Sequence, residues 1–308
     1  MKHRKIVVFG SFVVDLAFRT PRLPVKGETI KGLSFIMGPG GKGSNQAVAA
    51  KRAGANITMI TRVGDDALAD FAYSSFKREG LDLKYIFKDP LEKTAAAAIL
   101  VDNNTGDNQI VVTLGACLHF TSSEIDSICP VLEEAEYLLI QLEANIDAIE
   151  QVIEIAHQKG KKIILNPAPA FPLSDQLLEK VDYITPNETE AALLTGMDVS
   201  GANQIENIKK SAEKLLEKGI KVVIITLGEK GVLLKTKEIE QIFEPMKVQV
   251  VDTTGAGDAF NGGFVTALAE GKNLTDAIRF ANVVGALSVT RQGAAPAMPY
   301  RNEIDEYL

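Results

Sequence analysis

Short apolar runs alternate with helix-length segments over most of this 308-residue chain, and this alternation restricts the possible folds more than any other feature. The first run, 5–10, is uninterrupted and β-branched, as expected of a strand buried on both faces. Later runs at 137–142, 162–165, 183–185 and 222–227 are separated by segments with helical character. Strands that alternate with helices predict an α/β fold with a mostly parallel sheet sandwiched by helices.

Four short predicted strands nearer the N-terminus do not follow this alternation. They fall within two segments, at about 16–38 and 94–115, and turn-rich stretches separate them. We expect them to form a small β-sheet that stands off the main body as a lid. The predicted organisation is therefore a single domain over 1–308 with the lid strands inserted at those two places.

Composition excludes several classes of protein. A formal net charge of -7 with no run of Lys or Arg argues against a nucleic-acid partner. Cys117 and Cys129 are the only cysteines and form no C-x-x-C pair, which argues against a disulfide framework and a thiolate zinc site. The apolar run near the N-terminus is too short for a signal peptide or a membrane span. We expect a cytoplasmic protein without a membrane partner.

The segment 252–258, DTTGAGD, carries the strongest chemical signal. Its glycines let backbone N–H groups surround an anion, and the following helix directs its N-terminal dipole to the same place. Asp258 at that position can accept a proton from an attacking hydroxyl while the N–H groups of Gly255, Ala256 and Gly257 neutralise a transferring phosphoryl group. The alternative from this segment alone is that Asp258 is a helix N-cap after a glycine turn.

The segment 38–43, GPGGKG, matches G-x-G-x-x-G, but it does not follow the first strand as a dinucleotide-binding loop would. It is not a Walker A loop either. It suits close backbone approach to a small polar ligand, with Lys42 and Asn45 as donors. The alternative is a loop that only begins a helix.

Two carboxylates stand at predicted strand ends, Asp15 after the first strand and Glu143 after 137–142. Open parallel sheets bind ligands at the carboxyl ends of their strands, so both side chains, with Asn45, are candidates to bind a polyhydroxylated ligand. Each carboxylate alone is typical of a solvated loop.

Two further strand ends suit a nucleotide. The segment 187–190, NETE, begins a helix, which fits simple capping but also an Asn near phosphates and a Glu190 that holds hydrated Mg²⁺. The segment 226–231, TLGEKG, is a tight turn after a strand.

In this order, these segments resemble the ribokinase-like (PfkB) sugar kinase family over almost the whole chain. The stretches that carry the resemblance are GPGGKGSNQAVAA, TRVGDD, QLE, LNPAPA, ITPNETEA, ITLGEKGV, VQVVDTTGAGDAFNGGF and AIRFAN with SVTRQGAAPAMP. DTTGAGD together with the paired-glycine lysine segment is specific to the family.

The resemblance implies an ATP-dependent kinase that phosphorylates the 5-hydroxyl of a pentose, with D-ribose as first choice and Asp258 as base. The sugar contacts that it implies are Asp15, Gly40, Gly41, Lys42, Asn45, Glu143 and Asp258. The nucleotide contacts that it implies are Asn187, Thr226, Leu227, Gly228, Glu229, Lys230, Gly231, Gly257 and Asn282. It also implies a homodimer through the lid, whose exposed strand edges favour pairing.

The same resemblance implies two kinds of metal ion. Glu190 would stand near Mg²⁺. A monovalent cation, K⁺, would bind beside the anion hole, at Asp252, Thr254, Ser288, Arg291, Gly293 and Ala297, several of them through backbone carbonyls. Ala297 has no side-chain oxygen, unlike the usual last ligand.

One position departs from the family pattern. Val13 stands where the ribose-phosphorylating members of this family typically carry an Asn that hydrogen bonds with the sugar, and leaving a hydroxyl without that bond should cost about 1–3 kcal/mol. The departure favours 2-deoxy-D-ribose as an alternative substrate. More remote alternatives are a catalytically silent sugar or nucleotide sensor, which the intact Asp258 disfavours, and a dehydrogenase, which rests only on the G-x-G-x-x-G match.

Overall fold

The central sheet of the computed structural model has nine strands, and the structure describes residues 4–201 and 203–308. The strands are β1 Lys5–Phe9, β4 Asn56–Gly64, β5 Ile86–Asp89, β8 Tyr137–Ile140, β9 Lys162–Leu165, β10 Tyr183–Ile184, β11 Val222–Thr226, β12 Val232–Lys235 and β13 Glu240–Phe243. Their order is β13-β12-β11-β10-β9-β8-β1-β4-β5. Among the described strands of this sheet, only the β11–β12 and β12–β13 pairs, at one edge, are antiparallel, which confirms the predicted mostly parallel sheet.

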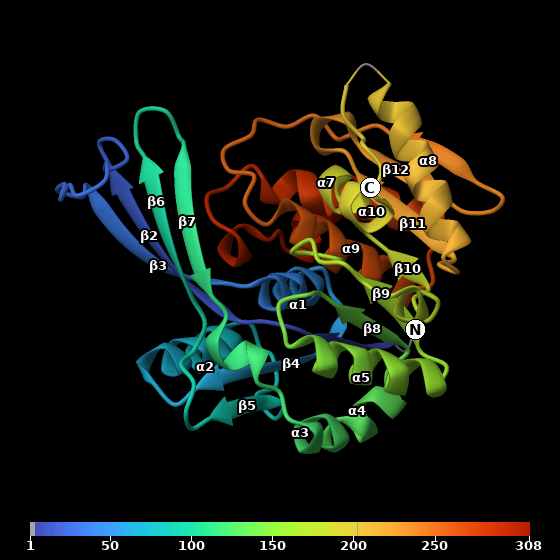
Figure 1. The fold of residues 1–308 in the computed structure, drawn as a ribbon, viewed down its shortest axis with the longest axis horizontal. Coiled ribbons are helices and arrows are strands. Elements are labelled where there is room, and N and C mark those ends of the chain that lie inside the picture. The colour runs from blue at the N-terminus through green and yellow to red at the C-terminus, as the bar shows by residue number, and fades with distance from the viewer. Residues whose placement is uncertain (1–3, 202) are drawn as a thin grey trace.

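Helices cover both faces of this sheet (Figure 1). They are α1 Lys42–Arg52, α2 Ala67–Arg78, α3 Ser122–Ser127, α4 Cys129–Glu134, α5 Ile146–Gln158, α6 Asp175–Leu178, α7 Glu188–Thr195, α8 Gln204–Glu217, α9 Ala256–Ala269, α10 Leu274–Ser288 and α11 Arg301–Asp305. In β1, Ile6 and Val8 belong to the hydrophobic core that includes residues of α1, α2, α9 and α10, whereas Val7 and Phe9 belong to the core that includes residues of α3–α5 and α8. Side chains alternate between the faces of a strand, so the uninterrupted apolar run serves two cores.

A second, four-stranded sheet projects from one side of the molecule (Figure 1). Its strands are β2 Val13–Thr20, β3 Ser34–Gly40, β6 Ala96–Asp102 and β7 Asn108–Thr113, in the order β3-β2-β6-β7. The β2–β6 pair is parallel and the outer pairs are antiparallel. This sheet, here called the lid sheet, confirms the predicted small sheet outside the α/β alternation.

Two predictions about the start of the lid sheet were wrong. The predicted loop 38–43 lies partly in β3, which continues to Gly40 before α1 begins at Lys42, because Gly38 and Gly40 pair with β2. Asp15 does not follow a strand of the central sheet but lies within β2 of the lid sheet. The lid sheet therefore carries a polar side chain of the candidate site on its own strand.

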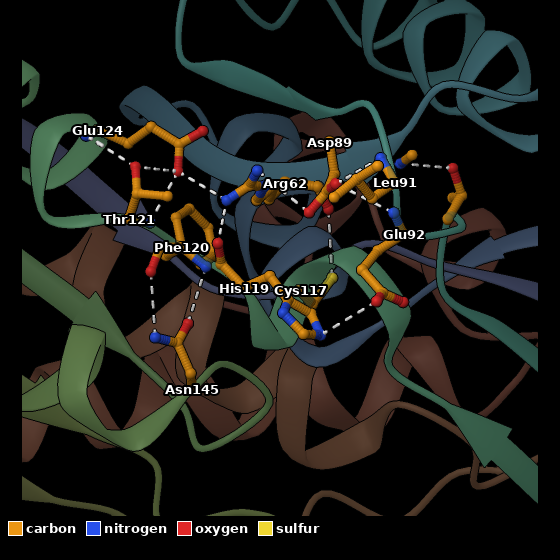
Figure 2. Close-up of polar contacts among 12 residues, drawn as sticks. Arg62, Asp89, Leu91, Glu92, Cys117, His119, Phe120, Thr121, Glu124 and Asn145 are labelled. Carbon is orange, nitrogen blue, oxygen red and sulfur yellow. Dashed lines mark hydrogen bonds and ion pairs between the residues drawn. The ribbon is translucent and has the colours of Figure 1, made fainter.

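A buried ion network fixes the chain where it returns from the lid sheet (Figure 2). Arg62 of β4 forms salt bridges with Asp89, over 3.1 Å, and Glu124, over 3.0 Å, and it donates a hydrogen bond to the backbone carbonyl of His119. The three acceptors lie at the end of β5, on the segment after β7 and on α3. A buried cation bound by two carboxylates is costly to disrupt, so the base of the lid sheet is tied to the core.

Smaller differences have local causes. The segment 122–133 forms two helices, α3 and α4, because Pro130 cannot continue the hydrogen-bond ladder of α3. The short strand β5 and the helix α11 were not predicted. Within 4–201 and 203–308, no helix is both long and apolar enough to cross a membrane.

Candidate active site

The site begins where β1 and β8 lie next to each other at the centre of the sheet. The chain leaves β1 toward β4 on one side and later adds β8 and β9 on the other, so this is a topological switch point where α/β sheets bind ligands. The N-terminus of α1 approaches closely there, since a Cβ on Gly43 would lie 2.7 Å from the backbone of Gly10 and Ser11. Glycine at position 43 thus lets α1 start directly over the strand end.

Glu143, which follows β8, is fixed at this helix terminus. Its carboxylate accepts hydrogen bonds from the N–H of Lys42, over 2.8 Å, and from the Ser11 hydroxyl. Burial raises its pKa, while Lys42 and these hydrogen bonds act in the opposite direction. The interpretation of Glu143 as a solvated loop charge was therefore wrong.

Asp15 enters the same site from the lid sheet. Gly40 on the neighbouring strand leaves room for it, because a Cβ there would overlap the Asp15 carboxylate. Burial, together with the charges of Glu143 and Asp258, raises the pKa of Asp15 from 3.8 to about 6. The charges of the other two predicted carboxylates, Glu143 and Asp258, thus act on Asp15.

The predicted anion hole corresponds to the N-terminus of α9. Gly255 is the N-cap, with φ 77°, and makes no side-chain capping bond, so the helix starts at Ala256. The first N–H groups of a helix have no intrahelical acceptor. The N–H of Ala256 donates to the Thr253 carbonyl over 3.2 Å, which leaves the N–H of Gly257 as a better placed donor for an anion.

Asp258 is not a helix cap, so that interpretation was wrong. It stands in the first turn of α9, and its two carboxylate oxygens accept hydrogen bonds from the side-chain amides of Asn45 and Gln46, each over 2.9 Å. Asn45 Oδ1 is buried and has no hydrogen-bond partner among the described residues. A buried acceptor beside Asp258 suits a hydroxyl group of a ligand, because such an acceptor is costly to leave unpaired.

A cavity of about 190 Å³ opens between the N-termini of α9 and α7. Its lining residues are Lys42, Asn166, Ala168, Thr185, Asn187, Glu190, Thr226, Gly255, Gly257, Asp258 and Asn261. A Cβ on Gly257 would meet no heavy atom within 4 Å, so this glycine leaves open space at the helix terminus. The cavity joins an anion-binding helix end to a carboxylate that can take a proton.

Charged side chains give this cavity both signs of charge. Burial acts to lower the pKa of Lys42, but Asp258, Glu143 and Glu190 together raise it, so the side chain stays cationic. Burial raises the pKa of Glu190. Glu190 also closes a capping box with Asn187 at the start of α7, in which each residue's backbone N–H donates to the other's side chain over 2.8 Å. The capping interpretation of this segment is thus confirmed, and the carboxylate still lines the cavity.

The predicted nucleotide contacts at 226–231 only partly reach the cavity. Thr226 lines it, whereas Leu227 is buried in the core and Lys230 donates a hydrogen bond to Gln204 on α8. Gly228, Glu229 and Lys230 form a short 3-10 turn that ends at Gly231, and none of them lines the cavity. Asn282, on α10, donates a long hydrogen bond of 3.5 Å to the Glu244 carbonyl.

Part of the predicted monovalent-cation loop is assembled. One Asp252 oxygen accepts from the N–H and hydroxyl of Thr254, and the other accepts from the N–H of Gly293 over 2.9 Å. Burial acts to raise the pKa of Asp252, but these hydrogen bonds hold it below its ordinary value. The Ser288 hydroxyl donates to the Gly285 carbonyl at the end of α10.

Two other predicted ligands are placed differently. The Arg291 side chain turns toward Glu303 and forms an ion pair with it. Ala297 is buried in a 3-10 turn, so it can offer only a backbone carbonyl.

Val13 starts β2, is only 3% exposed and packs with Ala95, Ala97 and Cys117. Alternation along β2 puts it on the same face as Asp15. Val13 is thus part of an apolar wall next to the polar site.

Sequence reasoning missed several polar residues of the site, namely Gln46, Gln141, Thr185 and Asn261. Asn261 follows Asp258 by three positions on α9 and accepts a hydrogen bond from the Thr185 hydroxyl over 2.6 Å. Helical spacing could have identified Asn261, since residues three apart share a helix face. Gln46 and Gln141 come from separate elements, and only the fold brings them together.

The fold and this cavity together define a class, that of α/β enzymes which transfer a phosphoryl group at a helix N-terminus. The family model for pfkB family carbohydrate kinases matches residues 3–301. The chain belongs to this family and is a carbohydrate kinase. The predicted family and the predicted ribokinase-like fold are thereby confirmed, and the alternative function as a dehydrogenase is excluded.

Individual relatives agree with this assignment. A ribokinase of Haemophilus influenzae is 41% identical over 305 residues, covering 99% of this chain and 98% of its own length. A deoxyribokinase of Salmonella typhi is 36% identical, covering 98% of both chains. The structure of an Arabidopsis thaliana ribokinase complexed with ribose and ATP superposes with a TM-score of 0.88 at 31% identity, covering 99% of this chain and 98% of that one.

Proposed function

We propose that this carbohydrate kinase transfers the γ-phosphoryl group of ATP to the 5-hydroxyl of D-ribose. The observation that carries the proposal is the position of Asp258, which lines the cavity together with Gly257 and accepts a hydrogen bond from the Asn45 amide. The ribokinase relatives support ribose as the substrate, and the ribokinase structure with ribose and ATP supports the donor.

In the proposed reaction, the hydroxyl oxygen attacks the γ-phosphorus, its proton moves to Asp258, and ADP leaves with the former bridging oxygen. Asp15, Asn45 and Glu143 orient the sugar, since carboxylate and amide oxygens accept from its other hydroxyls. The N–H of Gly257, the α9 dipole and the Lys42 cation stabilise the charge on the transferring group. These groups are fixed before the substrate arrives, so little reorganisation is needed.

Two metal ions belong to the proposal. Glu190, a buried carboxylate on the cavity wall, fits a Mg²⁺ ion that is bound mainly through water, and such an ion would offset phosphate charge. The Asp252 loop with Gly293 fits K⁺ less completely, because both Asp252 oxygens already accept hydrogen bonds. Backbone carbonyls would have to supply most of that site.

The test is ADP release by the purified chain with ATP and Mg²⁺, with D-ribose or 2-deoxy-D-ribose at matched concentrations. We expect turnover with ribose and a higher kcat/KM for ribose than for deoxyribose. Turnover with neither sugar would contradict the proposed substrate but not the family. Omitting K⁺ in a parallel series should lower the rate.

Val13 keeps 2-deoxy-D-ribose as a second candidate, although the comparisons do not favour it over ribose. An apolar wall at this position suits a sugar that lacks one hydroxyl, since no bond is lost there. If so, Val13→Asn should shift the ratio of kcat/KM values toward ribose by roughly tenfold, as 1–3 kcal/mol implies. An unchanged ratio would remove Val13 as a determinant of specificity.

We further propose that the chain is one domain, from which the lid sheet projects, and that two copies pair through this sheet. Exposed apolar side chains on one face of it support pairing, among them Phe18, Phe35, Met37 and Val111 at 37–71% exposed. A cytoplasmic location, where ATP is abundant, stays part of the proposal. The expectation that no nucleic acid binds stays a prediction.

A further inference from the structure

Two glutamines that are fully enclosed by protein lie directly behind the proposed base. Gln46 on α1 and Gln141 after β8 are both 0% exposed. The amide Nε2 of Gln46 donates to Asp258 Oδ1 and to Asn166 Oδ1, each over 2.9 Å. The amide Nε2 of Gln141 in turn donates to Gln46 Oε1 over 2.6 Å.

The acceptors fix the orientation of both amides. An ionised Asp258 can only accept hydrogen bonds, so the NH₂ end of Gln46 must face it. Asn166 presents its oxygen to Gln46 because its own Nδ2 donates to the Thr185 carbonyl over 3.0 Å. The oxygen of Gln46 then points to Gln141, which must donate. This leaves Gln141 Oε1 buried without a partner among the described residues, which is costly.

The two oxygens of Asp258 are held from different sides. Asn45 holds Oδ2 but belongs to the proposed sugar site, where its side chain would also bond with the ligand. Gln46 holds Oδ1 and has no exposed surface with which to contact a ligand. Gln46 is therefore the donor that can keep the carboxylate oriented throughout the reaction.

We propose that Gln46, locked in its orientation by Gln141, is a positioning residue that aims the Asp258 carboxylate at the attacking hydroxyl. The proposal rests on the proposed function, in which Asp258 is the base. Misplacement of a catalytic group by about 1 Å can lower a rate by roughly 100-fold. Loss of Gln46 should therefore lower kcat while sugar and ATP still bind.

The experiment compares Gln46→Met and Gln141→Met with the wild-type chain, in steady-state kinetics and in calorimetric sugar binding. We expect kcat to fall by roughly 10- to 100-fold in Gln46→Met and less in Gln141→Met, with both KM values and the sugar Kd within about threefold of wild type. Thr266→Val is the matched control. Thr266 is buried at the same α1–α9 contact, where its hydroxyl donates to the Ala50 and Gly262 carbonyls, and it does not bond with Asp258. It should lose stability but keep kcat.

An unchanged kcat in folded Gln46→Met would overturn the positioning role. So would a fall in kcat that is matched by equally weakened sugar binding, because that result indicates general distortion of the site. If Gln46→Met does not fold, Gln141→Met takes its place in the test. An unchanged kcat in that variant, or a fall in kcat with equally weakened sugar binding, would then overturn the positioning role. Asp258→Asn in the same assay separates the two claims. Turnover by that variant would refute the base itself, whereas loss of turnover leaves the glutamine result to test the positioning.

Discussion

At the scale of single residues, the site places three carboxylates with different surroundings around one ligand position. Asp258 is held by two amide donors, Glu143 by a helix N-terminus, and Asp15 only by its position on the lid sheet. Asp15 thus bears burial and the two like charges, which raise its pKa to about 6. An ionised Asp15 can accept hydrogen bonds from a sugar, but its charge lowers the stability of the protein without ligand.

This electrostatic strain predicts that Asp15→Asn stabilises the protein without ligand. A carboxyl group whose pKa is raised in the folded state contributes stability below its unfolded pKa and loses that contribution as pH rises through its folded pKa. Between pH 3.8 and about pH 6, the Asp15 carboxyl is mostly protonated in the folded chain but mostly ionised in the unfolded chain. An asparagine side chain at this position cannot ionise, so the free energy of unfolding should rise by up to about 3 kcal/mol at pH 8 and by about half of that at pH 5.

Urea unfolding at both pH values measures this effect. Asp126→Asn, at an exposed position on α3, is the control and should show no comparable dependence on pH. The same Asp15 variant should bind sugar more weakly. Equal stability of Asp15→Asn and wild type at pH 8 would mean that the lid sheet does not press Asp15 against the other carboxylates.

Most residues of the site could be predicted because they stand in short motifs whose chemistry is local, such as 252–258. Gln46 and Gln141 could not, since a glutamine in a helix or after a strand looks like any surface residue until its neighbours are known. Asp15 was predicted to belong to the site, but it was placed after the first strand and lies instead within β2. The error arose because β1 and β2 follow each other with only a short break.

At the scale of elements, the contact between α1 and α9 sets the position of the base. A Cβ on Gly262 of α9 would lie 2.5 Å from Ala49 Cβ and 2.7 Å from the Gln46 carbonyl oxygen. This close contact brings Asn45 and Gln46 within hydrogen-bond distance of Asp258. Small side chains on α1 at this contact, such as Ala49, are therefore required by the packing.

Gly262→Ala and Gly257→Ala should have opposite effects on stability. The first forces α1 away from α9 and should lower the free energy of unfolding by about 1–3 kcal/mol, with loss of kcat. In Gly257→Ala, the added Cβ meets no heavy atom within 4 Å, and alanine is a better helix former than glycine. This substitution should therefore raise the free energy of unfolding by up to about 1 kcal/mol. It should still lower kcat/KM for ATP, because its methyl group enters the cavity. Chemical unfolding and kinetics of both variants test this pair, and wild-type stability of Gly262→Ala would contradict the packing argument.

The boundaries of the elements show what local sequence cannot give. The strand β3 continues past the predicted lid segment 16–38 to Gly40, because pairing with β2 overrides the turn character of Gly38, Pro39 and Gly40. The division of 122–133 into two helices had a visible signal in Pro130. The four-residue strand β5 had none, since it is ordered by β4 beside it.

At the scale of the whole molecule, the lid sheet is the part that the main core does not cover. One face of this sheet carries the apolar side chains of Leu16, Phe18 and Phe35. The same face extends across β6 to Val111 on β7, which is 71% exposed. An apolar sheet face of this kind is a common site of association. The Arg62 network holds only the base of this sheet (Figure 2).

Light scattering tests the proposed pairing. We expect a mass of twice 33.2 kDa for the wild-type chain and a single-chain mass for Val111→Asp, because a charge in an apolar interface is costly to desolvate. Leu193→Asp, on α7 away from the lid sheet, should leave the mass unchanged. A wild-type chain that stays monomeric at micromolar concentration would refute the pairing.

The central claim is that Asp258 is the catalytic base of a sugar kinase, and Asp258→Asn tests it most directly. Asparagine keeps the shape and a hydrogen-bonding group but cannot take the hydroxyl proton, so ADP release with ribose should fall by at least about 100-fold. Calorimetry should still detect ribose binding to the variant. Loss of turnover with retained binding is the predicted result, and turnover within about tenfold of the wild-type rate would contradict the account.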